Sequence, residues 1–161
     1  MSADAPNFAE LLGPFIQRFP DASRPTFLAA LERGAAERYR GWADAAPEAA
    51  AGLRACADRE ERIAEIAEGL FPADDAARAL IAELLPEARD AYFAVFADLP
   101  LEDQWRIQAS AERQGANAWR LLAAGQDDAR VRDALHECAA LEEESALHLD
   151  KLVAERSAAN G

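Results

Sequence analysis

The chain has 161 residues, of which 51% are hydrophobic, and many of these are alanine, so we expect a single all-α domain. Its formal net charge of −13 and its pI of about 4.5 argue against nucleic-acid binding, because the chain repels phosphate backbones. The absence of an apolar run of about 20 residues, together with a polar first stretch unlike a signal peptide, leads us to expect a cytoplasmic protein that does not enter a membrane.

Residues 1–24 are expected to form an N-terminal capping segment. Phe8 and Leu12 share one face of a short amphipathic helix, which Pro14 breaks or kinks. A helix lying on a membrane surface would carry several lysines and arginines on its polar face, and only Arg18 is present. We therefore expect this segment to cover the rest of the domain.

Two helices are predicted next, over residues 25–45 and 48–70, with a turn between them. Pro25 suits a first helical turn, and Pro72 follows the second helix. Residues spaced by three and four predict the inward face of each helix. These inward stripes are Phe27, Ala30, Gly34, Glu37 and Gly41 in the first helix, and Leu53, Cys56, Glu60, Ile63, Ala67 and Leu70 in the second.

The second half of the chain repeats this pattern after a helical crossover over residues 74–97, which Pro86 interrupts. Helices are predicted from Pro100 to the turn at residues 124–128, and from there to Glu155, with a frayed tail over 156–161. Their inward stripes are Trp105, Gln108, Glu112, Gly115, Trp119 and Leu122 in the third helix, and Leu135, Cys138, Glu142, Ser145, Leu149 and Leu152 in the fourth.

Each of the four inward stripes therefore contains one glutamate: Glu37, Glu60, Glu112 or Glu142. In an antiparallel hairpin, two residues are level when they lie equally far from the turn. Glu37 and Glu60 have their midpoint at 48.5, and Glu112 and Glu142 have theirs at 127, and both midpoints fall in predicted turns. A charged group in an apolar stripe costs several kcal/mol unless it is paired, protonated or bound to a metal.

Over residues 25–155 the chain resembles the ferritin-like superfamily of antiparallel four-helix bundles, including the rubrerythrin type. In that superfamily helices one and three each give a glutamate, and helices two and four each give Glu-x-x-His, which together hold two irons or manganeses. The resemblance implies that Glu37, Glu60, Glu112 and Glu142 are metal ligands. The two histidine positions hold Ile63 and Ser145, so the nitrogen donors of such a site are absent.

Three explanations of the glutamates stay open. They form an all-carboxylate site for iron, manganese or another hard cation; or the metal is lost and arginines such as Arg38 and Arg59 neutralise them; or some of them face water. The first predicts a metal-binding protein, with oxygen- or peroxide-dependent oxidation if it is an enzyme. The others predict a metal-free helical scaffold or interaction module, and in either case we expect a homodimer.

Other candidates are weaker. His148 lies near Ser145 and offers a substitute ligand, and Tyr39 offers a redox or proton partner, but its offset from Glu37 puts it on another face. Cys56 and Cys138 each lie one turn before an inward glutamate, where a cysteine is most simply a small buried apolar residue.

Overall fold

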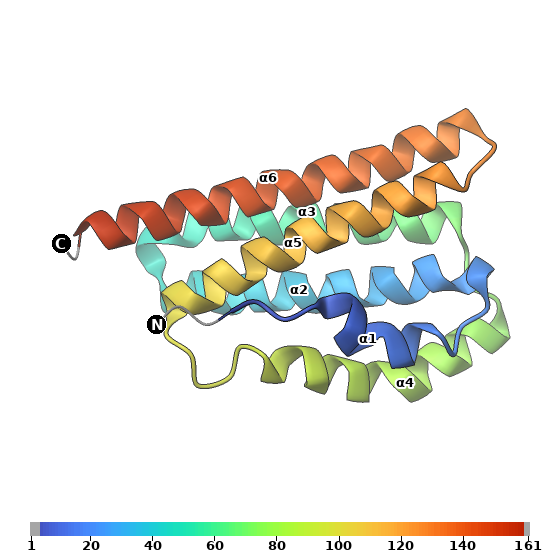
Figure 1. Cartoon of the computed structure of the whole chain (residues 1–161), viewed down its shortest axis with the longest axis horizontal. Helices are drawn as coiled ribbons and strands as arrows, with labels where there is room; N and C mark the ends of the chain where they lie inside the picture. The colour runs from blue at the N-terminus through green and yellow to red at the C-terminus, as the bar shows by residue number, and fades with distance from the viewer. Residues whose placement is uncertain (1–3, 160–161) are drawn as a thin grey trace.

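The computed structural model describes residues 4–159, and they form an all-α structure, as predicted (Figure 1). No helix among these residues is long and apolar enough to cross a membrane. Two single turns of 3₁₀ helix, Asp21–Ser23 and Pro47–Ala49, connect longer elements. The α-helices are α1 (Phe8–Ile16), α2 (Arg24–Ala45), α3 (Ala50–Leu70), α4 (Asp75–Ala94), α5 (Leu101–Ala124) and α6 (Ala129–Ala159).

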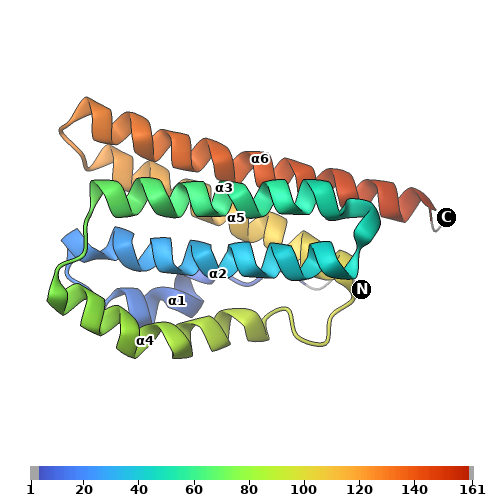
Figure 2. The same ribbon diagram turned by 180° about the vertical axis from the view of Figure 1, so that it is seen from behind.

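Two antiparallel hairpins make up most of the structure. Helices α2 and α3 form the first, α5 and α6 form the second, and the two hairpins also contact each other through α3 and α6. Helix α4 runs back along α2 and so carries the chain from the end of one hairpin to the start of the other (Figure 2). Helix α1 lies across α4 and α5. The predicted crossover is therefore present, and it covers one side of α2.

Several boundaries differ from those expected. Pro86 lies inside α4 and Pro14 inside α1, and neither ends its helix. The turn of the first hairpin is longer than expected, because Pro47–Ala49 form a 3₁₀ turn before α3 begins at Ala50. Helix α6 continues to Ala159, beyond the expected end at Glu155, and residues 160–161 lie outside the described part of the chain.

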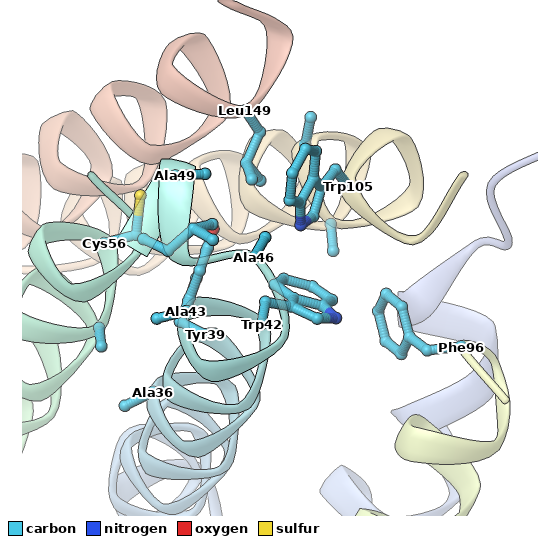
Figure 3. Packing of buried hydrophobic residues seen from close by; sticks show 14 of the residues in the cluster. Ala36, Tyr39, Trp42, Ala43, Ala46, Ala49, Cys56, Phe96, Trp105 and Leu149 are labelled. Atoms are coloured by element: carbon cyan, nitrogen blue, oxygen red, sulfur yellow. The ribbon is translucent and has the colours of Figure 1, made fainter. Parts of the chain in front are cut away.

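Of the three hydrophobic clusters among the described residues, one packs α1 and α4 against α2, and the other two lie at the two ends of the hairpins. One contains Tyr39, Trp42, Phe96, Trp105 and Leu149, whose rings and side chains interlock (Figure 3). Trp42 makes edge contacts with Tyr39 and Phe96, at 5.3 and 5.8 Å between ring centroids. The other is formed mainly by Ala29, Ile63, Ala64, Ala67, Ala116, Trp119, Ala123, Leu135, Cys138 and Ala139.

A polar layer separates these two clusters. Along α3, Glu60 lies between Ala57 of the first cluster and Ile63 of the second. Along α6, Glu142 likewise lies between Leu149 and Cys138. Both glutamates are buried, so the middle of the structure contains carboxylates where a core would ordinarily hold apolar side chains.

Candidate metal centre

Three glutamates from three helices meet in this layer: Glu32 of α2, Glu60 of α3 and Glu142 of α6. One carboxylate oxygen from each lies within 4.8 Å of the corresponding oxygen of the others. Oxygens on opposite sides of one hard divalent ion are about 4 Å apart around Mg²⁺ and about 5 Å apart around Ca²⁺. The three carboxylates are therefore close enough to share a single ion.

Glu37, a predicted ligand, lies outside this cluster. Its side chain is exposed and forms an ion pair with Arg89 of α4. The prediction that Glu37 faces inward from α2 is therefore wrong. Five residues correspond to about 140° around an α-helix, so Glu37 and Glu32 point in different directions.

The cause of this difference is that α2 is buried on two faces. Gly34, which belonged to the predicted stripe, faces Arg89 and Phe93 of α4. The face of α2 that points into the hairpins instead carries Glu32 and Tyr39, one heptad apart. A signal for Glu32 was present in the sequence: 60 − 32 = 28, close to the spacing of 142 − 112 = 30 in the second hairpin.

Among the buried carboxylates, Glu60 has the fewest hydrogen bonds. It is 0% exposed, and neither of its oxygens has a hydrogen-bond partner among the described residues. Burial, followed by the negative charges of Glu112 and Glu32, raises its pKa well above the ordinary value for a glutamate. An unpartnered buried polar group costs about 1–3 kcal/mol, and the neighbouring Glu32 can relieve this cost only when one of the two acids is protonated.

Glu142 and Glu32 are also placed where ionisation is unfavourable. Glu142 is buried and accepts one hydrogen bond, from Nε1 of Trp119 at 3.0 Å. Burial and the charges of Glu32 and Glu112 raise its pKa well above the ordinary value. Burial and the charge of Glu112 raise the pKa of Glu32 to about 7. A cation placed between these carboxylates would instead lower the pKa of Glu142 and of Glu32, because it favours their ionised forms.

Glu112, the remaining predicted ligand, is held by a hydrogen-bond network. Its Oε1 accepts from the hydroxyl of Tyr39 at 2.5 Å and from Nε2 of Gln108 at 2.6 Å. Gln108 in turn accepts from Nη2 of Arg38 at 2.8 Å. Tyr39, which the sequence placed on another face, thus contacts a predicted ligand, and burial followed by the charge of Glu112 raises the pKa of this tyrosine well above its ordinary value.

Arginine neutralises only part of this negative charge. The guanidinium carbon of Arg38 lies 4.3 and 4.4 Å from the ring centroids of Phe96 and Tyr92, and Arg38 reaches Glu112 only through Gln108. Arg59, by contrast, points away to Glu144 at the surface. Four carboxylates and one arginine leave three negative charges if every acid ionises, which favours either protonation or a bound cation.

The two positions where the resemblance would place histidine do not supply a nitrogen donor. Ile63 is fully buried in the apolar cluster. Oγ of Ser145, one turn beyond Glu142, is buried and has no partner in the part of the chain that the structure describes. His148 lies against Gly52 of α3, outside the three-carboxylate cluster, and burial and Arg59 lower its pKa.

The cysteines are free thiols. Cys56 and Cys138 are both buried, and burial raises the pKa of each, to about 12 for Cys138. A raised pKa keeps a thiol protonated at neutral pH, so neither cysteine has the thiolate character of a reactive or ligating residue.

Gly115 of α5 makes room for Glu142, and this predicts a measurable difference between glycines. A Cβ at Gly115 would lie 2.5 Å from Oε1 of Glu142, whereas a Cβ at Gly41 would meet nothing within 4 Å. We expect Gly41→Ala to raise the free energy of unfolding by about 0.5–1 kcal/mol, the usual gain in a helix. We expect Gly115→Ala to lower it by about 1 kcal/mol or more, because Glu142 must move. Urea unfolding of both variants measures this, and equal stabilisation would show that Glu142 does not approach Gly115.

Searches of protein-family models, of curated proteins and of solved structures give no match to this chain. The carboxylate cluster must therefore be interpreted from its own chemistry.

Proposed function

We propose that this chain is a carboxylate metal-binding protein in which Glu32, Glu60 and Glu142 hold one divalent ion. The observation that carries the proposal is Glu60, which is fully buried, has no hydrogen-bond partner for either oxygen within residues 4–159, and lies beside two further carboxylates. Native structures rarely leave such a group unsatisfied. A metal ion would satisfy these oxygens and offset the repulsion among the three acids.

The donor set indicates the class of metal. Carboxylate oxygens suit hard ions such as Mg²⁺, Ca²⁺ and Mn²⁺, whereas zinc and copper sites usually contain histidine or cysteine. Manganese or iron(II) fits the proposal best among redox metals. Oε1 of Glu112 already accepts two hydrogen bonds, so we assign this residue to the edge of the site and propose one ion rather than two.

A ferritin-like origin is part of this proposal. Each of the four helices α2, α3, α5 and α6 contributes one glutamate to the polar layer, as in that superfamily. Glu32 takes the place that the sequence gave to Glu37. The loss of both histidines and the engagement of Glu112 would then make this a reduced, oxygen-only version of a di-metal centre. Oxidase activity would require a redox metal at the site.

Metal analysis of the protein purified without chelator tests the proposal, together with Mn²⁺ titration of the chelator-treated protein. We expect about one ion per chain and a rise in melting temperature with Mn²⁺. A free Mn²⁺ concentration about 100 times the dissociation constant stabilises the folded protein by about 2.7 kcal/mol. Glu60→Gln should lose both effects. Glu37→Gln is the matched control, because this glutamate is exposed and paired with Arg89.

The outcomes separate the alternatives. If neither wild type nor Glu60→Gln binds metal and Mn²⁺ leaves the melting temperature unchanged, the metal proposal is overturned. If Glu37→Gln loses metal as Glu60→Gln does, the assignment of Glu32 in its place is overturned.

The second candidate is a metal-free helical scaffold that forms a homodimer. Leu121 of α5 and Leu147 of α6 favour it, since they are 76% and 65% exposed and are the large apolar side chains most open to solvent among the described residues. Sedimentation of the metal-free protein would then show a dimer that Leu121→Glu or Leu147→Glu dissociates. A monomer at all protein concentrations would argue against this candidate.

A further inference from the structure

An apolar pocket of about 310 Å³ lies beside the carboxylate cluster. Helix α1 forms one wall through Phe8, Leu12 and Ile16, and α5 forms another through residues that include Ala118 and Leu121. Its volume is at the lower end of the range for small-molecule sites, about 300–1,000 Å³. The pocket is therefore large enough for a small organic molecule.

Glu112 and Glu142, which are buried, line the inner end of the pocket together with Glu32, and Glu32 and Glu142 also belong to the carboxylate cluster. Arg24 also lines the pocket and is paired with Asp21. Gln108 and Gln114 also line it but are already bonded, Gln108 to Arg38 and Glu112, and Gln114 to the backbone of Pro6 and Phe8.

The carboxylates keep unused capacity to accept hydrogen bonds. Within residues 4–159, no N–H group donates to Glu32, and Glu142 receives one N–H hydrogen bond, at Oε1 from Trp119. The other polar contacts of these two acids are with neighbouring carboxyl groups. A ligand that enters this pocket therefore meets hydrocarbon along its length and free carboxylate oxygen at its end. Such an end repels an anion and attracts a cation that carries N–H donors.

We propose that this pocket binds a small aliphatic amine, with its chain between α1 and α5 and its ammonium group at Glu32 and Glu142. An ammonium group has three N–H donors. Charge-assisted bonds of about 2.8 Å arranged tetrahedrally place the acceptor oxygens about 4.5 Å apart. The cluster oxygens of Glu32 and Glu142, which both line the pocket, lie within 4.8 Å of each other, so one ammonium group can donate to both.

This proposal does not rest on the metal site, although the two share carboxylates. The apolar walls and the free oxygens are present whether or not a metal binds. An ammonium group and a divalent ion both need Glu32 and Glu142, so we expect them to compete.

Calorimetric titration of the chelator-treated protein with n-octylamine tests the proposal. Octanoate and 1-octanol have the same chain length and a negative or neutral head. We expect octylamine to bind at least tenfold more tightly than octanol, and octanoate not to bind. Saturating Mn²⁺ should weaken octylamine binding at least tenfold if the metal site exists.

Two variants test the two ends of the pocket. Ala118→Phe fills the space between the walls, and Glu32→Gln removes the charge at the inner end, so each should weaken octylamine binding at least tenfold. Ala140→Phe, at an exposed position of α6, is the matched control and should bind as wild type does. Thermal melting identifies any variant that fails to fold, and Glu32→Gln carries the test if Ala118→Phe is lost.

Equal binding of octylamine and octanol, binding of octanoate, or unchanged binding by both Ala118→Phe and Glu32→Gln would overturn the proposal. Absence of octylamine binding would also overturn it, even if Mn²⁺ binds. Octylamine binding without Mn²⁺ binding would support it and would overturn only the metal function.

Discussion

Replacing Glu60 with methionine is expected to stabilise the metal-free protein and to abolish its response to metal. Methionine has about the same length as glutamate and needs no hydrogen bonds, whereas both oxygens of Glu60 are buried without partners. Exchanging a buried unsatisfied group for a well-packed apolar one gains about 2 kcal/mol. For a chain of this size, 1 kcal/mol changes the melting temperature by about 2–4 °C.

Thermal melting with and without metal distinguishes the gain in stability of the metal-free Glu60→Met variant from its loss of stabilisation by Mn²⁺. Melting of Glu60→Met with chelator should occur at a higher temperature than that of wild type, and added Mn²⁺ should shift only wild type. Glu65→Met provides the control, since Glu65 is an exposed residue of α3 and its replacement should change stability by less than about 0.5 kcal/mol. A metal-free Glu60→Met variant that melts several degrees lower than wild type would show that Glu60 is accommodated by protein alone.

The metal-free protein is expected to lose stability as the pH rises from about 5 to 8. Glu32, Glu60 and Glu142 all have a pKa raised by burial and by neighbouring carboxylates, and that of Glu32 is about 7. An acid with a raised folded-state pKa favours folding while it is protonated, and this contribution disappears as the pH rises through that pKa. One pKa unit corresponds to about 1.4 kcal/mol. The rise in the pKa of Glu32 from 4.5 to about 7 therefore accounts by itself for a loss of about 3 kcal/mol in the free energy of unfolding.

The charged groups around Glu32 act on its pKa in opposite directions. Glu112 of α5 raises its pKa, while Arg38, on its own helix, opposes that effect. Urea unfolding at several pH values in the presence of chelator measures the slope. Glu32→Gln should flatten it, and a wild-type stability that increases from pH 5 to 8 would contradict the raised pKa values.

Metal should reverse this pH dependence. Carboxylates bind a cation in their ionised form, so the ion competes with protons and its affinity rises with pH. With saturating Mn²⁺ the protein should therefore be more stable at pH 8 than at pH 5. The same three acids would thus give opposite pH profiles in the two states.

Much of the architecture could be predicted because the inward stripes expected for α3, α5 and α6 consist mostly of residues that are buried. There, the spacing of three and four residues identified Glu60, Glu112 and Glu142 as buried glutamates, and the structure confirms their burial. Helix α2 is different, since it also contacts α4. A helix with two overlapping buried faces has two possible stripes of inward residues. The stripe predicted from the sequence ran through Glu37, whereas the face that points into the hairpins carries Glu32 and Tyr39.

The contacts between hairpins were beyond the reach of helical periodicity. Periodicity says which side of a helix is buried but not which residue of another helix it meets. The bond from Tyr39 to Glu112 joins residues 73 positions apart, and Gln114 of α5 bonds to the backbone of Pro6 and of Phe8, where α1 begins. These details follow from packing, which a single sequence does not display.

The division of the polar layer between the hairpins has a kinetic consequence. Glu32 and Glu60 come from the first hairpin, and Glu112 and Glu142 from the second. Each hairpin closes over a short stretch of chain, which is fast, whereas docking of the two closes a longer loop and comes later. All four acids meet only at docking. The refolding rate of the metal-free protein should therefore fall as these acids ionise, while the rate of helix formation stays nearly constant.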